Sequence, residues 1–154
     1  VMDRAEHNAL LRQIVAEAAG RPAPGGSLLP VFLSGHLCQA VKPGVLDMIE
    51  SCGTLVVDDD LYHGLRHISM DMAETGDPIG AIADWYLNRN FGAPCPTRLD
   101  PGIDWDGWLV DAMGRARAQG LIVLMAKFFE PHYFYYPRLK KTFYDQGIPP
   151  LLLD

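Results

Sequence analysis

Three side chains suited to acid–base or electrostatic chemistry lie within six residues, at Lys127, Glu130 and His132. An ammonium group can stabilise developing negative charge, and a carboxylate or an imidazole can carry a proton. These residues follow the apolar run 121–125, Leu-Ile-Val-Leu-Met, which is typical of a strand buried on both faces. Ligands in open α/β sheets collect beyond the carboxyl ends of parallel strands. This segment is therefore the strongest candidate site in the sequence.

A second candidate site follows another predicted strand. Ser34, Gly35 and His36 come directly after the apolar run 28–33. Small residues at such a position let backbone N–H groups approach an anion. The segment has neither the additional glycines of a dinucleotide fingerprint nor the lysine of a P-loop. We therefore expect it to line the ligand side of the sheet, without a nucleotide motif.

Asp59 is the third candidate, in the acidic triplet 58–60 that follows the strand predicted over 54–57. Two interpretations stay open for this triplet. Its carboxylates could contact a ligand or a hard cation, which prefers oxygen ligands. Alternatively, they could cap the next helix by accepting hydrogen bonds from its first N–H groups.

The elements that must position these residues alternate between strands and helices along the chain. Strands are predicted over 28–33, 54–57, 121–125 and 149–153, and helices over 3–19, 44–51, 78–88, 105–119 and 137–146. This rhythm predicts a three-layer α/β fold of the Rossmann or flavodoxin-like kind, with a parallel sheet of about four strands and flanking helices. We expect a single domain over 1–154, with a leading helix in 1–20 and the sheet with its crossovers in 28–154.

Composition excludes several classes of protein. The net charge of −6 argues against a nucleic-acid surface, and no apolar run approaches the roughly 20 residues of a membrane helix. Three cysteines without CxxC spacing indicate a reducing compartment, which favours the cytoplasm. We expect Cys52 to lie in the core and Cys95 to be a packed loop residue.

Several short segments, in a fixed order, resemble a known family. Those in the first half are Asp-Asp-Asp-Leu-Tyr at 58–62, Gly-Asp-Pro at 76–78, Trp-Tyr-Leu at 85–87 and Pro-Cys-Pro at 94–96. Those in the second half are Lys-Phe-Phe-Glu-Pro-His at 127–132, Tyr-Pro at 136–137 and Gly-Ile-Pro at 147–149. Together they resemble the C-terminal α/β half of subunits of the 2-hydroxyacyl-CoA dehydratase and benzoyl-CoA reductase family.

This resemblance implies radical chemistry on a CoA thioester. In that family two related subunits pair, and each is built of two α/β lobes with an iron–sulfur cluster, commonly [4Fe–4S], between them. An ATP-dependent activator supplies single electrons. The outcome is either loss of the 2-hydroxyl group, a lyase reaction, or reduction of an aromatic ring, an oxidoreductase reaction. The resemblance therefore implies that the chain is a fragment of a larger two-lobe subunit in a heterodimer.

The sequence departs from the family at the cluster. The family motif reads Lys-Phe-Cys-Glu-Pro, and its cysteine position is Phe129 here. We therefore expect no metal ligand at this position and no cluster held by this chain alone. The alternatives are a cluster-free structural partner subunit of the family, or a free-standing flavodoxin-like ligand-binding domain. In the dehydratase or reductase lobe that the resemblance implies, Lys127, Glu130 and His132 surround the former cluster position.

Overall fold

The computed structural model describes residues 2–22, 24, 26–35, 41–74, 76–95 and 104–154. The strands are β1 (Leu29–Gly35), β2 (Thr54–Asp59), β3 (Gly120–Leu124) and β4 (Pro150–Leu153). The helices are α1 (Arg4–Ala19), α2 (Pro43–Ser51), α3 (Leu65–Ile68), α4 (Pro78–Asn88), the 3₁₀ helix η1 (Arg89–Phe91), α5 (Trp105–Ala116) and α6 (Glu130–Asp145).

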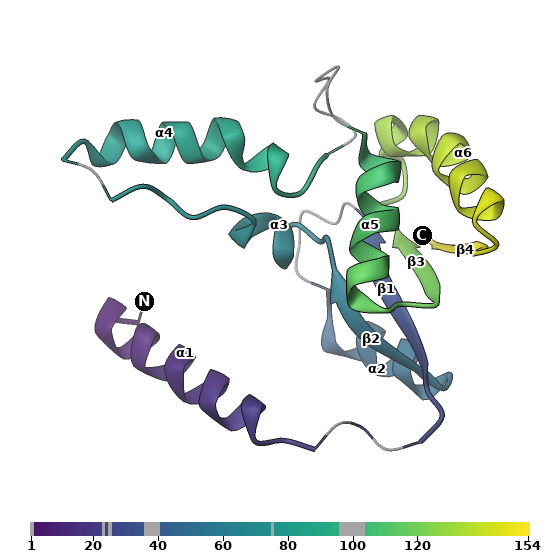
Figure 1. Ribbon diagram of the computed structural model, residues 1–154, viewed down its shortest axis with the longest axis horizontal. Helices are drawn as coiled ribbons and strands as arrows, with labels where there is room; N and C mark the ends of the chain where they lie inside the picture. Colours follow the sequence, from purple (N-terminus) through teal and green to yellow (C-terminus); the bar gives the residue numbers. More distant parts are fainter. Residues whose placement is uncertain (1, 23, 25, 36–40, 75, 96–103) are drawn as a thin grey trace.

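The four strands form one parallel sheet in the order β2-β1-β3-β4 (Figure 1). The chain reverses its direction of travel across the sheet between β1 and β3, so the crevice at their carboxyl ends is the topological switch point. All four carboxyl ends lie at the same edge of the sheet. The prediction of an α/β fold with a parallel sheet of about four strands is confirmed.

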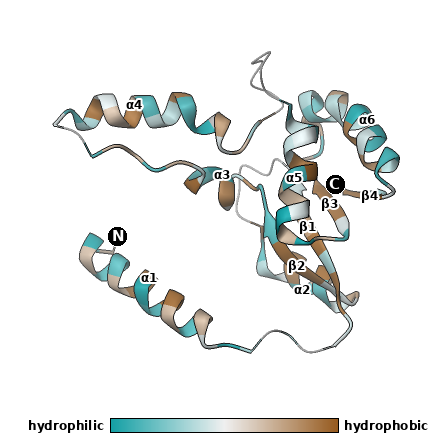
Figure 2. Ribbon diagram, viewed as in Figure 1, coloured by the Kyte–Doolittle hydropathy of each residue, from teal (hydrophilic) through white to brown (hydrophobic). Residues whose placement is uncertain are grey.

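Helices cover both faces of the sheet, with α5 and α6 on one face and α2 on the other. Alternate residues of β1 divide between the faces: Phe32 packs with the α5–α6 core, whereas Leu33 packs with Ile49 of α2. This double burial explains why β1 and β3 are almost continuously apolar in sequence (Figure 2). The result is a three-layer arrangement in which a ligand is expected at the carboxyl ends of the strands.

Helix α1 forms as predicted but contributes no buried residue. Asp3 caps its start by accepting a hydrogen bond from the backbone N–H of Ala5 at 2.8 Å. The helix lies away from the sheet at the amino end of the chain (Figure 1), and its apolar side chains stay exposed. The sheet and its covering helices are therefore built from the residues that follow α1.

The predicted start of the last helix is wrong. Helix α6 begins at Glu130, not at residue 137, so residues 130–136 are helical instead of forming a loop. Pro131 occupies the first turn, where its missing N–H costs nothing, and Pro137 is tolerated inside the helix. The buried positions His132, Leu139 and Phe143 follow helical spacing across both prolines. This burial outweighs the local preference that made Pro137 look like a helix start.

Of the burial predictions for the two described cysteines, one is wrong and one is confirmed. Cys52 is exposed at the end of α2, so its assignment to the core is wrong. The chain turns there towards Gly53 and β2, which leaves the thiol outside the packed layer. Cys95 is buried, as expected of a packed loop residue.

Candidate functional site

A buried carboxylate, Asp60, joins the carboxyl ends of β1 and β2 to the start of α5. Its Oδ1 accepts a hydrogen bond from the backbone N–H of Gly35 at 3.1 Å. Its Oδ2 accepts from Arg66 Nη2 at 2.8 Å and from Trp105 Nε1 at 3.0 Å. Asp60 is fully buried and Arg66 nearly so. Because the Gly35 N–H is bound to this carboxylate, it is not open to a ligand anion.

Arg66 extends this connection to the segment after η1. Its Nε donates to the carbonyl of Asp60 at 3.0 Å, and its Nη1 donates to the carbonyls of Ala93, at 3.0 Å, and Pro94. The guanidinium is therefore satisfied by a carboxylate and three carbonyl oxygens. It fixes the backbone just before Cys95 against the end of β2.

The end of β1 is closely packed. A Cβ atom on Gly35 would lie 1.9 Å from the carbonyl oxygen of Leu124, and its φ of 137° suits glycine alone. Ser34 is fully buried, and its hydroxyl has no hydrogen-bond partner among the described residues. His36 lies outside the described residues. The predicted site after β1 is thus a buried strand end as far as Gly35.

Asp59 behaves as the capping alternative describes. Its Oδ1 accepts hydrogen bonds from the backbone N–H groups of Leu61 at 2.9 Å and Leu65 at 3.3 Å. Burial raises the pKa of this carboxyl group, against the effect of those two hydrogen bonds. A Cβ atom on Gly64 would lie 1.8 Å from the same oxygen, so a larger residue there would displace the Asp59 carboxylate. Asp59 also lines a cavity of about 210 Å³ beside β2 and α2.

An aromatic stack links the loop after β3 to the Asp60 cluster. The rings of Phe129 and His132 stack with centroids 4.7 Å apart, and His132 meets Trp105 edge-on at 6.5 Å. His132 is 1% exposed. Burial lowers its pKa to about 4, and the charge of Arg66 contributes in the same direction. His132 is therefore neutral at physiological pH and buried behind Phe129.

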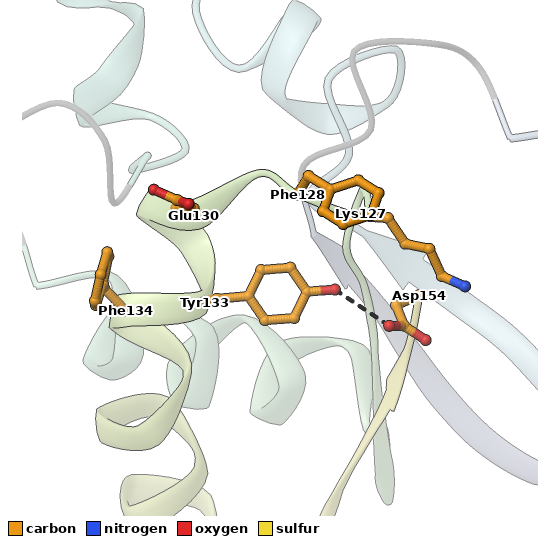
Figure 3. A pocket seen from close by; sticks show the side chains of 6 residues that line it. All are labelled: Lys127, Phe128, Glu130, Tyr133, Phe134 and Asp154. Atoms are coloured by element: carbon orange, nitrogen blue, oxygen red, sulfur yellow. Dashed lines mark hydrogen bonds between the residues drawn. The ribbon is translucent and has the colours of Figure 1, made fainter.

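Lys127 and Glu130 line an open cavity of about 540 Å³ at the carboxyl ends of β3 and β4 (Figure 3). We call it the α6 cavity; its lining residues are Lys127, Phe128, Glu130, Tyr133, Phe134 and Asp154. In Figure 3, Tyr133 reaches from the first turns of α6 towards the end of β4. Its hydroxyl donates to Asp154 Oδ2 at 3.4 Å. Burial and the neighbouring Asp154 raise the pKa of Tyr133.

Phe128 has an unusual backbone at the rim of this cavity. Its φ is 65°, in the left-handed region that favours glycine, and its side chain is 94% exposed. A bulky residue in this conformation carries strain of about 1–2 kcal/mol. Such outliers are found where a functional site fixes the chain.

The structure brings together only part of the predicted site. Lys127 and Glu130 share the α6 cavity, whereas His132 is buried beneath it and does not line it. Asp59 lies at the end of β2, and β1 and β3 separate that strand from β4. The two cavities are therefore at opposite ends of the same sheet edge.

The sequence did not indicate the contacts that hold these strand ends together. Asp60 is the buried acceptor for Arg66 and Trp105, and Tyr133 bonds to Asp154 beside the α6 cavity. For Asp60 and Arg66 the sequence offered one signal, an arginine six residues after a carboxylate at a strand end. Trp105 is 45 residues from Asp60, and only the tertiary fold brings the two together.

The described cysteines do not fit the iron–sulfur cluster that the resemblance implies. Cys52 is exposed at the end of α2, Cys95 is buried after η1, and position 129 carries a phenyl ring. Within the part of the chain that the structure describes, no three His, Cys, Asp or Glu side chains gather as a metal site. Nor does any described helix have the length and apolar character to cross a membrane.

Comparison with known proteins gives matches over nearly the whole chain. Residues 1–154 match the family described as 2-hydroxyglutaryl-CoA dehydratase, D-component. The chain is 29% identical to the (R)-phenyllactyl-CoA dehydratase beta subunit of Clostridium sporogenes, over 99% of this chain and 39% of that protein. It is 25% identical to the beta subunit of lactoyl-CoA dehydratase of Anaerotignum propionicum, over 99% of this chain and 40% of that protein.

A third relative is named for a different reaction. The chain is 23% identical to a benzoyl-CoA reductase subunit of Thauera aromatica, over 94% of this chain and 37% of that protein. The chain therefore spans about two fifths of the length of the curated relatives it matches.

Proposed function

Because this chain belongs to the family of the 2-hydroxyglutaryl-CoA dehydratase D-component, we propose that it is one lobe of a subunit that processes CoA thioesters. The complex would be a 2-hydroxyacyl-CoA dehydratase or a benzoyl-CoA reductase. The family match over residues 1–154 is the observation that carries this proposal. The chain spans about two fifths of its relatives, so the activity of the whole protein is part of the proposal.

The α6 cavity is the proposed position of the reacting thioester. The ammonium group of Lys127 would stabilise negative charge on the thioester carbonyl oxygen, and Glu130 would orient the acyl group or carry a proton. Both line the cavity, which supports these roles. His132 is neutral and buried, so its proposed part is to hold Phe129 and Trp105 in place.

The assignment of Ser34, Gly35, His36 and Asp59 to the substrate side stays a prediction. It is supported by the position of β1 and β2, whose carboxyl ends share one sheet edge with β3. The Asp60 carboxylate holds the end of β1 in place through Gly35. We therefore propose that these residues shape the edge of the site, with Asp59 available from its own cavity.

A second candidate is a cluster-free partner lobe of the same family. The family resemblance implies a [4Fe–4S] cluster and one-electron chemistry, but the described residues of this chain do not supply its thiolates. Phe129 instead stacks on His132, which continues to Trp105 in the buried layer. This packed stack favours a lobe that positions substrate or partner and leaves the electron chemistry to other parts of the complex.

The proposed partners are a related second subunit and an ATP-dependent activator, in the cytoplasm. Two of the relatives are named as beta subunits, which supports an assembly of several subunits.

The test uses the full-length protein, purified without oxygen together with its partner subunit and activator. We expect loss of water from a 2-hydroxyacyl-CoA or reduction of an aromatic acyl-CoA. Iron and sulfide content of the complex then separates the two candidates, because a cluster-free lobe gives a complex with iron in one of its two subunits only. A complete complex that turns over no CoA thioester would contradict the proposal.

A further inference from the structure

Trp105 contacts both the Asp60 carboxylate and the first turns of α6. Its indole N–H donates to Asp60 Oδ2 at 3.0 Å. Its ring meets the ring of His132 edge-on at 6.5 Å and lies 5.4 Å from the ring of Tyr135. Asp60, Trp105 and His132 are each 2% exposed or less, so residues of this chain alone enclose these contacts. Trp105 therefore connects the ends of β1 and β2 to the start of α6 within the packed interior.

The segment 126–132 is closed into a compact turn. The backbone N–H of Phe129 donates to the carbonyl of Ala126 at 3.1 Å, and that of His132 donates to the carbonyl of Phe129 at 3.3 Å. The Phe129 ring also stacks on His132, with centroids 4.7 Å apart. Lys127 and Glu130, which line the α6 cavity, belong to this turn. A displacement of His132 would therefore displace both cavity residues with it.

The hydrogen bond to Asp60 fixes how the Trp105 ring is turned. A hydrogen bond to a carboxylate is about twice as strong as one between neutral groups. A buried N–H that loses its acceptor carries the full cost of desolvation, so the ring would turn towards another acceptor. Because protein interiors are closely packed, that rotation would move the ring surface against which His132 packs.

From these contacts we infer that Asp60 is a positioning residue for Lys127 and Glu130, and that it acts through Trp105 and His132. Asp60 does not line the α6 cavity, so its effect on that cavity must pass through other side chains. The kinetic consequence rests on the proposed function, which places the reacting thioester in this cavity. Loss of the Asp60 charge should lower kcat, because a small misplacement of a catalytic group is costly even when its cause is remote. KM should change little, since a residue outside the cavity makes no contact with bound substrate.

The first test is hydrogen–deuterium exchange of the full-length protein, followed by mass spectrometry of its peptides. Asp60→Asn removes the carboxylate charge, whereas Trp105→Phe removes only the N–H donor and keeps an aromatic ring. Both variants should raise the exchange rate of residues 126–134 by roughly 10-fold, the factor expected from the loss of one buried charge-assisted hydrogen bond. Only Asp60→Asn should also raise the rate in residues 29–35, because Trp105→Phe keeps the hydrogen bond from the Gly35 N–H to Asp60. Should Asp60→Asn fail to fold, Trp105→Phe alone decides.

Ile49→Ala provides the matched control. Ile49 is buried on the opposite face of the sheet, where it packs with Leu33 of β1. Its truncation destabilises the fold and leaves the Asp60 contacts in place, so exchange in residues 126–134 should rise no more than in the rest of the protein. If Asp60→Asn loosens that segment and Trp105→Phe does not, the effect travels through Gly35 and β1, and the inference is wrong. Unchanged exchange of the segment in both variants would overturn it as well.

The second test measures turnover by the complex of the full-length protein with its partner subunit and activator, using the 2-hydroxyacyl-CoA or aromatic acyl-CoA that the complex accepts. In Asp60→Asn and Trp105→Phe, kcat should fall about 10- to 100-fold with KM nearly unchanged. The double variant should be no more impaired than Asp60→Asn, because both substitutions break the same connection. Additive losses, or a rise in KM without a fall in kcat, would overturn the positioning role. A complete complex that turns over no CoA thioester would contradict the proposed function, whereas hydrogen exchange still decides whether Asp60 acts on residues 126–134.

Discussion

The ring of Phe129 lies on the ring of His132, with centroids 4.7 Å apart and an angle of 29° between the planes. Phe129 precedes the first turn of α6, and His132 points into the layer below. A cysteine at position 129 would therefore place its sulfur beside His132, where the phenyl ring now lies. A substitution at position 129 therefore alters the contact with His132 and the type of atom next to it.

Phe129→Cys in the full-length protein should increase the amount of bound iron. The thiolate restores the ligand type that the family motif carries at this position, and cysteines outside this chain would supply the other ligands. Iron and acid-labile sulfide are measured after anaerobic purification. Phe129→Ser is the matched control, because it opens the same space without a thiolate. Equal iron in the Cys and Ser variants would count against the alignment of this motif.

Asp60→Asn should lower the free energy of unfolding by about 3 kcal/mol or more, because it leaves the buried Arg66 charge without its partner. The control is Asp104→Asn, which removes an exposed ion pair with Arg138 and should cost less than about 1 kcal/mol. Urea denaturation of the full-length protein measures both values. Similar losses in the two variants would show that the Asp60 contacts do not stabilise the strand ends.

The stability of the protein should fall at acid pH through His132. Burial lowers its pKa from 6.5 to about 4 in the folded protein, so the unfolded state binds an extra proton between these values. The free energy of unfolding therefore decreases as the pH falls from about 6.5 towards 4, by roughly 3 kcal/mol over the whole window. His132→Phe keeps an aromatic ring without a titrating group and should flatten this dependence. Parallel pH profiles for the variant and the unaltered protein would contradict the prediction.

Phe128→Gly should give a more stable protein than Phe128→Ala, by about 1 kcal/mol. Both variants lose the same exposed ring, but only glycine adopts a φ of 65° without strain.

At ordinary helical positions alanine is more stable than glycine, and Gly114 of α5 provides that comparison, because nothing lies within 4 Å of a Cβ atom added there. Gly114→Ala should therefore stabilise the protein, by roughly 0.5–1 kcal/mol. Thermal midpoints of the three variants and the unaltered protein decide the order.

The sequence was sufficient to predict the layered fold. Continuous apolar runs at β1 and β3, separated by helical segments, indicate a parallel sheet buried on both faces, and the structure confirms it. The family resemblance is also confirmed. Helix limits near proline were less predictable, because Pro131 and Pro137 are both acceptable first-turn residues and only burial of His132 decides between them.

The site was only partly predictable. The proximity of Lys127 and Glu130 follows from their spacing, and the structure places both on one cavity. Their distance from Asp59 depends on the strand order, which composition and periodicity do not fix. The contact between Trp105 and Asp60 likewise depends on how α5 crosses the sheet. Whether these residues act on a substrate stays a prediction.

The Asp60 carboxylate ties two strand ends and the start of α5 to one point, whereas the α6 cavity lies beyond that anchorage, at the other end of the sheet edge. Hydrogen bonds therefore cross-link the edge at its β1–β2 end, and substitutions of the exposed side chains at positions 128 and 134 should leave that cross-link intact.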